Sequence, residues 1–290
     1  MTPEPSKPAV IVISSHVARG SVGGRGALFV LERLGHPVWF VPTVMLAWHP
    51  GHGRSTRIET PLNRFTDLLD DLAESPFLTD VGAIMTGYFA DPMQAVAAAQ
   101  FIEKVRAKRP DMLVVVDPIM GDKGHLYVHA ETAGAIRDWL VPQASLITPN
   151  VFELGWLTGE PVEGTTAIVA AARKLALPQV VVTSAPALMR GSIGTVLVAG
   201  EDAFMAEHRE VSGAPNGTGD LLTAVLTARL LAGARPETAL KGACAAVFEM
   251  VARSARAGAD ELRLSAEQDV IVHPMAEVSI RRMSAAPRKP

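Results

Sequence analysis

The sequence predicts an α/β fold: a doubly wound, mostly parallel sheet with helices on both faces and an antiparallel strand pair at one edge. Two observations predict it. Short, continuous apolar runs rich in Val and Ile recur along the chain, and longer segments with helical spacing lie between them. A strand that is apolar at every residue is buried on both faces, as in a parallel sheet. Alternation of such strands with helices gives right-handed βαβ units.

The apolar runs predict six strands, at residues 9–13, 37–41, 81–85, 112–116, 145–147 and 179–183. Helical spacing predicts five helices between or beside them, at residues 26–34, 62–73, 92–108, 130–140 and 165–175. These elements account for the parallel part of the fold.

After residue 183 the pattern changes. Residues 194–199 and 203–209 predict the antiparallel pair, with its turn at 200–202. Two helices rich in Ala and Leu follow, at 219–231 and 236–257, and Gly233 is expected to end the first.

The domain organisation is expected to be simple, because no linker rich in Pro, Gly or Ser divides the chain. We expect one domain over residues 9–274. Residues 1–8 are expected to form a loose N-terminal tail, and residues 275–290 a peripheral C-terminal tail.

Composition excludes several classes of protein. Of the 290 residues, 48% are hydrophobic and 20% charged, which excludes intrinsic disorder. A net charge of −3 argues against a nucleic-acid partner. A single cysteine, Cys244, cannot form an intrachain disulfide, and no apolar run reaches the ~18 residues that a membrane span needs. Without a secretion signal at the start, we expect a cytoplasmic protein with no membrane partner.

The carboxyl ends of the strands are the expected ligand site of such a sheet. Polar or glycine-rich residues follow each apolar run, and all of them are expected to meet at one edge. They include Ser15, Thr43, Tyr88, Asp117, Asn150, Glu153, Thr183 and Ser184.

The most specific motif is residues 216–220, Asn-Gly-Thr-Gly-Asp, directly before a helix. Glycines allow close approach of a ligand, and free amides at a helix start attract a phosphate. Asp220 would repel a phosphate, but its place is explained if it accepts a proton from an attacking hydroxyl. The alternative is that Asp220 is only a favourable acid in a first helical turn.

Two further groups of side chains have both a functional and a structural interpretation. Asp117 and Glu153 follow different strands and can share a magnesium ion through water and phosphates. Asp117 also precedes Pro118 and can merely shape a turn. Ser15 and Thr43 can hydrogen-bond a small polar ligand and Tyr88 can stack on a ring, or each can cap a loop.

These motifs together resemble the pyridoxal kinases of the ribokinase-like superfamily. The matching segments run in the family's order from about residue 10 to about residue 255. They are Ser15-His16-Val17, Arg19-Gly20, Val22-Gly23, Arg25, Thr86-Gly87-Tyr88, Asp117-Pro118-Ile119-Met120-Gly121-Asp122, Thr148-Pro149-Asn150, Glu153-Leu154, Leu157-Thr158-Gly159, Thr183-Ser184 and Gly217-Thr218-Gly219-Asp220. The glycine and aspartate motif is typical of the whole superfamily. The Ser-His-Val and Thr-Gly-Tyr segments narrow the resemblance to the pyridoxal kinases.

The resemblance implies ATP-dependent phosphorylation of the 5′-hydroxymethyl group of pyridoxal, and of pyridoxine and pyridoxamine, in vitamin B6 salvage. By the same resemblance, Asp220 would be the general base of the reaction. The anion hole would consist of Gly217, Thr218 and Gly219, and the pyridine ring would be held by Ser15, Thr43 and Tyr88. Asp117, Asn150 and Glu153 would support Mg²⁺ and the ATP phosphates, with Asp117 and Glu153 at the metal, and Thr183 and Ser184 would touch the nucleotide. A homodimer and a monovalent cation such as K⁺ are also typical of the family.

The sequence departs from the family near the vitamin pocket. Gly24 stands where the family has Asn, and Trp48-His49-Pro50 replaces an Asn-His-Thr segment. Two alternatives therefore stay open. One is a hydroxymethylpyrimidine kinase or other small-alcohol kinase, and the other is a non-catalytic vitamin-binding or sensing protein that keeps the fold.

Overall fold

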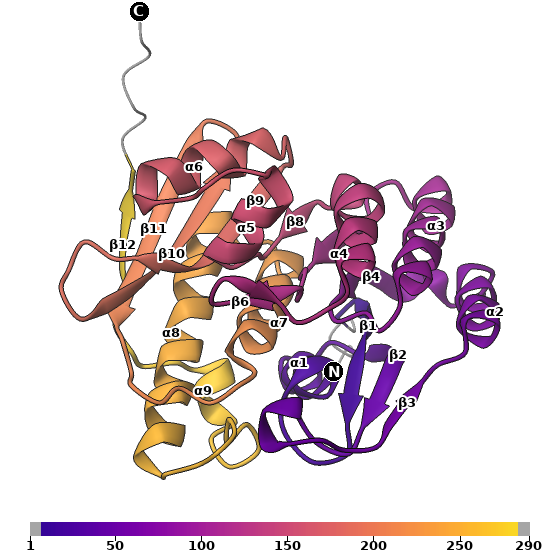
Figure 1. Ribbon diagram of the computed structural model, residues 1–290, viewed down its shortest axis with the longest axis horizontal. Helices are drawn as coiled ribbons and strands as arrows, with labels where there is room; N and C mark the ends of the chain where they lie inside the picture. The colour runs from indigo at the N-terminus through magenta and orange to yellow at the C-terminus, as the bar shows by residue number, and fades with distance from the viewer. Residues whose placement is uncertain (1–6, 284–290) are drawn as a thin grey trace, which may run out of the picture.

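The computed structural model describes residues 7–283 and is built around a ten-stranded sheet (Figure 1). The strand order is β12-β11-β10-β9-β8-β5-β4-β1-β2-β3. The strands are β1 (Ala9–Val17), β2 (Val38–Leu46), β3 (Arg57–Glu59), β4 (Val81–Thr86), β5 (Leu113–Val116), β8 (Leu146–Ile147), β9 (Gln179–Pro186), β10 (Ser192–Ala199), β11 (Asp202–Arg209) and β12 (Ser279–Arg282). A separate two-stranded hairpin consists of β6 (Gly121–Asp122) and β7 (His125–Leu126).

The middle of the sheet is parallel and both ends are antiparallel. Strands β2, β1, β4, β5, β8 and β9 pair in parallel, whereas β3 pairs antiparallel with β2. At the other end β10, β11 and β12 continue the sheet from β9 in antiparallel fashion. The predicted fold class is confirmed, and the predicted antiparallel pair is β10 and β11, with β12 outside it.

Helices cover both faces of the sheet (Figure 1). They are α1 (Gly23–Arg33), α2 (Leu62–Ala73), α3 (Pro92–Lys108), α4 (Ala130–Ala135), α5 (Val151–Thr158), α6 (Gly164–Lys174), α7 (Thr218–Leu231), α8 (Pro236–Arg256) and α9 (Asp269–Val272). In β1, Val10 and Val12 pack with α1, α7 and α8, while Ile11 and Ile13 pack with α2 and α3. Burial of successive residues on opposite faces explains why the strand is apolar without alternation.

Several predicted boundaries need correction. Strands β1 and β2 continue past their apolar runs, so Ser15 and Thr43 lie within strands and not in the loops after them. The backbone pairing of the two strands persists through these polar residues, with a register shift between Ser14 and His16. The helix expected at 130–140 is α4 followed by a π-helical segment, Ile136–Leu140.

The sequence patterns missed six short elements. Strands β3, β6, β7 and β12 have two to four residues, α9 has four, and α5 has eight. Strand β12 lies inside the segment 275–290 that was expected to be a peripheral tail, and it is the outer edge strand of the sheet. The rest of the two expected tails, 1–6 and 284–290, lies outside the described residues.

None of the helices between residues 7 and 283 combines the length and the apolarity that crossing a membrane requires.

Candidate active site

The start of α7 leaves its first backbone amides open. Gly217, the residue before the helix, has a left-handed backbone with φ +94°, and no side chain caps the helix. A Cβ at Gly217 would lie 2.8 Å from the carbonyl oxygen of Ser21, so the turn requires glycine. The first amides of a helix have no intrahelical partner. The amides at this helix start, those of Thr218 and Gly219 included, are therefore available to an anion.

Asp220 lies in the first turn of α7 and is partly exposed. One carboxylate oxygen accepts a hydrogen bond from the backbone N–H of Gly23 at 2.8 Å. Burial raises the pKa of Asp220 to about 6, although the Gly23 N–H opposes this shift. Within residues 7–283 this carboxylate forms no ion pair. Asp220 is thus a carboxylate of raised proton affinity beside an open helix start.

Asp117 is buried and contacts the second turn of α7. Its carboxylate accepts a hydrogen bond from the Thr223 hydroxyl at 3.1 Å, and Thr148 lies 3.0 Å from that hydroxyl. A Cβ built on Gly219 would stand 3.9 Å from the Asp117 carboxylate. Burial, then the negative charges of Glu153 and Asp220, raise the pKa of Asp117 well above its usual range.

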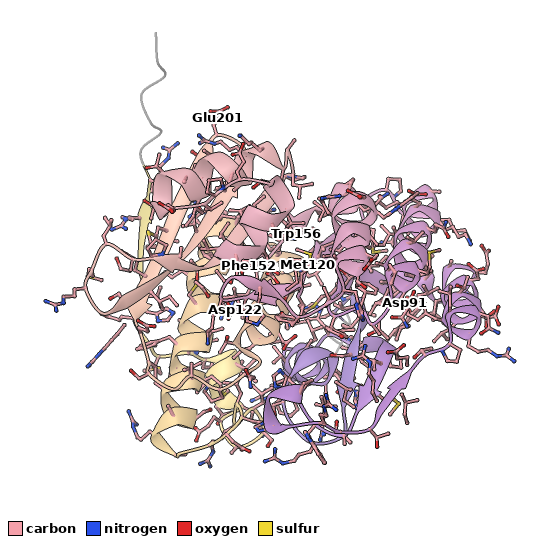
Figure 2. The ribbon with its side chains drawn as sticks, viewed as in Figure 1. Asp91, Met120, Asp122, Phe152, Trp156 and Glu201 are labelled. Carbon is pink, nitrogen blue, oxygen red and sulfur yellow. The ribbon has the colours of Figure 1, made fainter. Side chains whose placement is uncertain are left out.

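Asn150 and Glu153 form a capping box at the start of α5. The Asn150 side chain accepts from the backbone N–H of Glu153, and the Glu153 carboxylate accepts from that of Asn150, both at 2.9 Å. The other carboxylate oxygen of Glu153 accepts from the N–H groups of Met120 at 2.7 Å and Gly121 at 3.3 Å. Figure 2 labels Met120, Asp122 and Phe152 around this helix start. Burial raises the pKa of Glu153 to about 7 against these three donors.

The segment between Asp117 and the hairpin β6–β7 has an unusual backbone. Ile119 has φ +40°, a left-handed conformation that is rare for a β-branched residue. Such backbone strain concentrates at ligand sites. The segment is fixed there by the Glu153 carboxylate and by Asn150, whose amide donates to the Gly121 carbonyl at 2.8 Å.

The three carboxylates are close enough to influence each other but do not form a metal cage. Within residues 7–283 no three His, Cys, Asp or Glu side chains are grouped as metal ligands. The charges of Glu153 and Asp220 both raise the pKa of Asp117. A divalent cation beside Asp117 would relieve that repulsion, and Mg²⁺ commonly keeps waters and phosphates as its other ligands. The donor set therefore fits a Mg²⁺ ion that arrives with a nucleotide.

A cavity of about 170 Å³ adjoins the α7 start. Thr183 and Ser184 line it together with Thr218 and Gly219, and its floor includes Cys244. Ser184 has φ +56°, a left-handed backbone at an exposed position of the cavity wall. Cys244 is a buried free cysteine, and burial raises the pKa of its thiol to about 12, so the side chain stays neutral.

Of the three residues predicted at the pyridine ring, Ser15 lies on β1, Thr43 lies on β2 and Tyr88 lies two residues after the end of β4. Ser15 is buried, and its hydroxyl oxygen would be 2.4 Å from a Cβ at Gly23, so it lies against the start of α1. Thr43 is fully buried and donates to the Tyr88 carbonyl at 2.7 Å. The proton of Thr43 is therefore used within the protein, and its oxygen remains as an acceptor.

Other residues that support Tyr88 were not predicted. Arg57 of β3 donates to the Tyr88 hydroxyl with two nitrogens at 3.2 Å each, and its guanidinium lies 5.7 Å from the ring centroid. The Tyr88 N–H donates to the Ser14 hydroxyl at 3.2 Å. Arg57 is about 30 residues from Tyr88 in a very short strand, and no sequence pattern signals such a contact.

The geometry thus brings Asp117, Glu153 and Asp220 together, and it places Thr183 and Ser184 on the same cavity as the glycine motif. A doubly wound sheet with an open, glycine-flanked helix start and a first-turn carboxylate has the architecture of a ribokinase-like kinase. This is the class of protein that the fold and the site define.

Comparisons with known proteins agree. A family model described as phosphomethylpyrimidine kinase matches residues 70–264. A pyridoxine/pyridoxal/pyridoxamine kinase of Bordetella avium is 39% identical over 259 residues, covering 87% of this chain and 88% of the relative. A pyridoxal kinase of Rubrobacter xylanophilus is 32% identical over 282 residues, covering 95% and 97%.

Solved structures give the same result. The pyridoxal kinase of Leishmania donovani, in complex with ADP and pyridoxine, superimposes with a TM-score of 0.89 at 26% identity, covering 95% of this chain and 99% of that one. The chain belongs to the pyridoxal kinase family of the ribokinase-like superfamily.

Proposed function

We propose that this protein transfers the γ-phosphoryl group of ATP to the 5′-hydroxymethyl group of pyridoxal, in vitamin B6 salvage, and that it also accepts pyridoxine and pyridoxamine. The observation that carries the proposal is the open start of α7 with Asp220 in its first turn. The relatives are kinases of these vitamers, and the Leishmania donovani relative holds ADP and pyridoxine. Binding of ATP and of the vitamer follows from the same family.

Asp220 acts as the general base in this proposal. A carboxylate that has one partner, the Gly23 N–H, retains acceptor capacity for the proton of the 5′-hydroxyl. As the hydroxyl oxygen forms its bond to the γ-phosphorus, the bond from phosphorus to the leaving ADP oxygen breaks and Asp220 takes the proton. Phosphoryl transfer has a loose transition state, so positioning contributes more than basicity and a carboxylate suffices.

The amides of Gly217, Thr218 and Gly219 form the proposed anion hole. They lie at the positive end of a 14-residue helix. The absence of side chains at Gly217 and Gly219 lets the transferred group approach the backbone closely. Thr183 and Ser184 extend this surface into the adjoining cavity, which we assign to the nucleotide.

Asp117 and Glu153 are the proposed protein contacts of Mg²⁺. When bound, the ion neutralises charge on the ATP phosphates. Asp117 faces the α7 start, whereas Glu153 already accepts three backbone N–H groups, so we assign Glu153 a water-mediated contact. Asn150 acts by closing the start of α5 and holding the Gly121 carbonyl. A requirement for K⁺, a homodimer and a cytoplasmic location complete the proposal by analogy with the family.

Ser15, Thr43 and Tyr88 are proposed to hold the pyridine ring. Tyr88 presents a half-buried ring fixed at its hydroxyl by Arg57, and Ser15 lies beside the glycines that begin α1. An aromatic face that is fixed before binding can stack on a flat ligand with little loss of conformational entropy.

The test is product formation by the purified protein with ATP and Mg²⁺, with pyridoxal and hydroxymethylpyrimidine as parallel substrates. We expect phosphorylation of pyridoxal and a smaller kcat/KM for hydroxymethylpyrimidine. The reverse preference would support the alternative of a hydroxymethylpyrimidine kinase. Binding of pyridoxal without any turnover would support the non-catalytic vitamin-binding alternative.

A further inference from the structure

Glu261, in the segment after α8, is a buried carboxylate at the junction of several segments. It is 8% exposed. One oxygen accepts the Ser21 N–H at 2.7 Å, and the other lies 3.3 Å from both an Arg19 guanidinium nitrogen and Nε2 of His52. Its backbone also forms an isolated parallel bridge with Asn216. One side chain therefore joins segments that are more than 200 residues apart.

The turn of residues 19–23 connects Glu261 to the proposed base. Gly20 has φ +121°, and a Cβ there would lie 2.4 to 2.8 Å from the Glu261 carboxyl group. The Ser21 carbonyl lies against Gly217, and two residues later Gly23 donates to Asp220. A displacement of Ser21 would therefore move neighbours of both the anion hole and the base.

The loop of residues 48–53 is tied to the same carboxylate. His52 contacts Glu261 directly, and Nδ1 of His49 accepts from Gly51 N–H at 3.0 Å and from the Asn216 amide at 3.2 Å. The loop contains Trp48-His49-Pro50, where the sequence departs from the family at the edge of the proposed vitamin pocket. Asn216 directly precedes the glycine motif, so the loop has two connections to the α7 start.

We propose that Glu261 is a positioning residue, which holds the turn of residues 19–23 against Asp220 and holds the loop of residues 48–53, which follows Thr43 of β2, against Asn216 at the α7 start. The inference deepens the proposed function and rests on it. Glu261 does not touch the reacting groups. It acts through Ser21 and His52.

The charge of Glu261 is essential to this role. Two donors, the Ser21 N–H and the Arg19 guanidinium, reach its two oxygens, and Nε2 of His52 lies 3.3 Å from one of them. Hydrogen bonds to an ionised acceptor are shorter and stronger than neutral ones. Gln keeps the shape and can accept from Ser21, but its NH₂ group would face the donors of Arg19 and His52. Glu261→Gln should therefore release the loop of residues 48–53 more than the turn.

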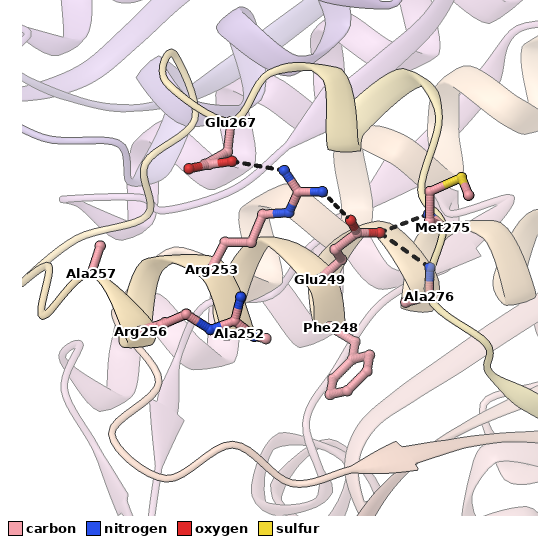
Figure 3. Close-up of a pocket in the computed structure, with 9 residues that line it drawn as sticks. All are labelled: Phe248, Glu249, Ala252, Arg253, Arg256, Ala257, Glu267, Met275 and Ala276. Atoms are coloured by element: carbon pink, nitrogen blue, oxygen red, sulfur yellow. Dashed lines mark hydrogen bonds and ion pairs between the residues drawn. The ribbon is translucent and has the colours of Figure 1, made fainter.

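A matched control is Glu267→Gln. Glu267 is also a carboxylate of the segment after α8, and it pairs with Arg253 at 2.9 Å (Figure 3). It lines a different cavity, together with Phe248 and Met275, and has no role in the proposed machinery. The two variants remove the same charge from the same part of the chain, one at the site and one away from it.

The experiment has two readouts. Steady-state kinetics of Glu261→Gln should show a fall of about tenfold in kcat/KM for pyridoxal, mostly in KM, with KM for ATP changed less than about twofold. Hydrogen exchange of the substrate-free protein should be faster in residues 48–53, with a smaller change at Ser21. Glu267→Gln should leave both readouts at wild-type values.

His52→Gln is the second variant, because a partly exposed loop residue can be replaced without unfolding. His52→Gln should raise KM for pyridoxal. In the double variant with Glu261→Gln, the loss of transition-state stabilisation calculated from kcat/KM should be smaller than the sum of the losses in the two single variants, as expected for residues that act together. The inference would be overturned by additive losses in the double variant. It would also be overturned if Glu261→Gln changed KM for pyridoxal and KM for ATP equally, or left hydrogen exchange unchanged. If the wild type fails to phosphorylate pyridoxal, the proposed function fails, whereas the exchange readout still tests the positioning contacts.

Discussion

Helices α5 and α7 both begin at the ligand edge of the sheet, but their first turns are satisfied in different ways. The start of α5 is closed by the reciprocal hydrogen bonds of Asn150 and Glu153. The start of α7 has no side-chain cap, and its N-cap residue is Gly217. Each helix carries an acid in its first turn, yet the Glu153 carboxylate accepts three backbone N–H groups and Asp220 accepts one.

The difference separates two functions of a helix terminus. Amides that already have protein partners stabilise the fold, whereas open amides can bind an anionic ligand. We therefore assign the transferred phosphoryl group to α7 and a mainly structural role to the capping residues of α5.

The largest effect is expected for Asp220→Asn. Loss of a positioned base typically reduces turnover by about 10² to 10⁴-fold. The Asn side-chain oxygen can still accept the Gly23 N–H, so the thermal unfolding midpoint should stay close to that of the wild type. Steady-state kinetics and thermal unfolding of the same preparation check both parts. Normal turnover would remove Asp220 from the role of base.

Gly219→Ala tests the openness of the α7 start. The position is exposed, and the nearest atom to an added Cβ is a carboxylate oxygen of Asp117 at 3.9 Å, so the fold should accept alanine. The methyl group would enter the space assigned to the phosphoryl group and displace it by about 1 Å, which costs about 10²-fold in rate. Steady-state kinetics measure the loss of activity. An unchanged free energy of unfolding shows that the loss is confined to the active site. Full activity would place the phosphoryl group elsewhere.

The pH dependence of kcat/KM distinguishes Asp220 of α7 from Glu153 of α5. Asp220, with a pKa of about 6, must be ionised to accept a proton, so kcat/KM should fall about tenfold per pH unit below about 6. The sign follows from the raised pKa: protonation removes the base as the pH is lowered. Rates measured from pH 5 to 8 with saturating ATP and Mg²⁺ provide the profile. A limb that persists in Asp220→Asn and disappears in Glu153→Gln would assign it to Glu153 of α5 instead.

The smallest catalytic effect is expected for Asn150→Ala. Removing an N-cap side chain costs about 0.5 to 2 kcal/mol of stability. Denaturant unfolding should show this loss, while kcat should change far less than in Gly219→Ala. A large fall in kcat without loss of stability would show that the α5 start takes a direct part in the reaction, and it would contradict the comparison.

The sequence predicted the parts of this structure that depend on local patterns. Helices 62–73 and 92–108 were predicted with the bounds of α2 and α3, and a proline marks the start of each, Pro61 before α2 and Pro92 as the first residue of α3. The six strands of the parallel region were also found. The glycine and aspartate motif predicted the α7 start, since its signal lies within five residues.

Contacts between distant segments could not be predicted. Arg57 contacts Tyr88 from a three-residue strand, and Glu261 joins Ser21 and His52 from more than 200 residues away. Helix α5 was missed because its eight residues follow directly on a short strand, although the Asn150 and Glu153 spacing of a capping box was present. Local pattern identifies the chemical groups, and tertiary packing decides which of them remain available.

The most direct test of the account is a crystal structure with a non-hydrolysable ATP analogue, Mg²⁺ and pyridoxal. We expect the γ-phosphate at the amides of residues 217–219 and the pyridoxal 5′-oxygen within hydrogen-bond distance of the Asp220 carboxylate. A γ-phosphate bound away from the α7 start, or a vitamer hydroxyl that does not reach Asp220, would contradict the account.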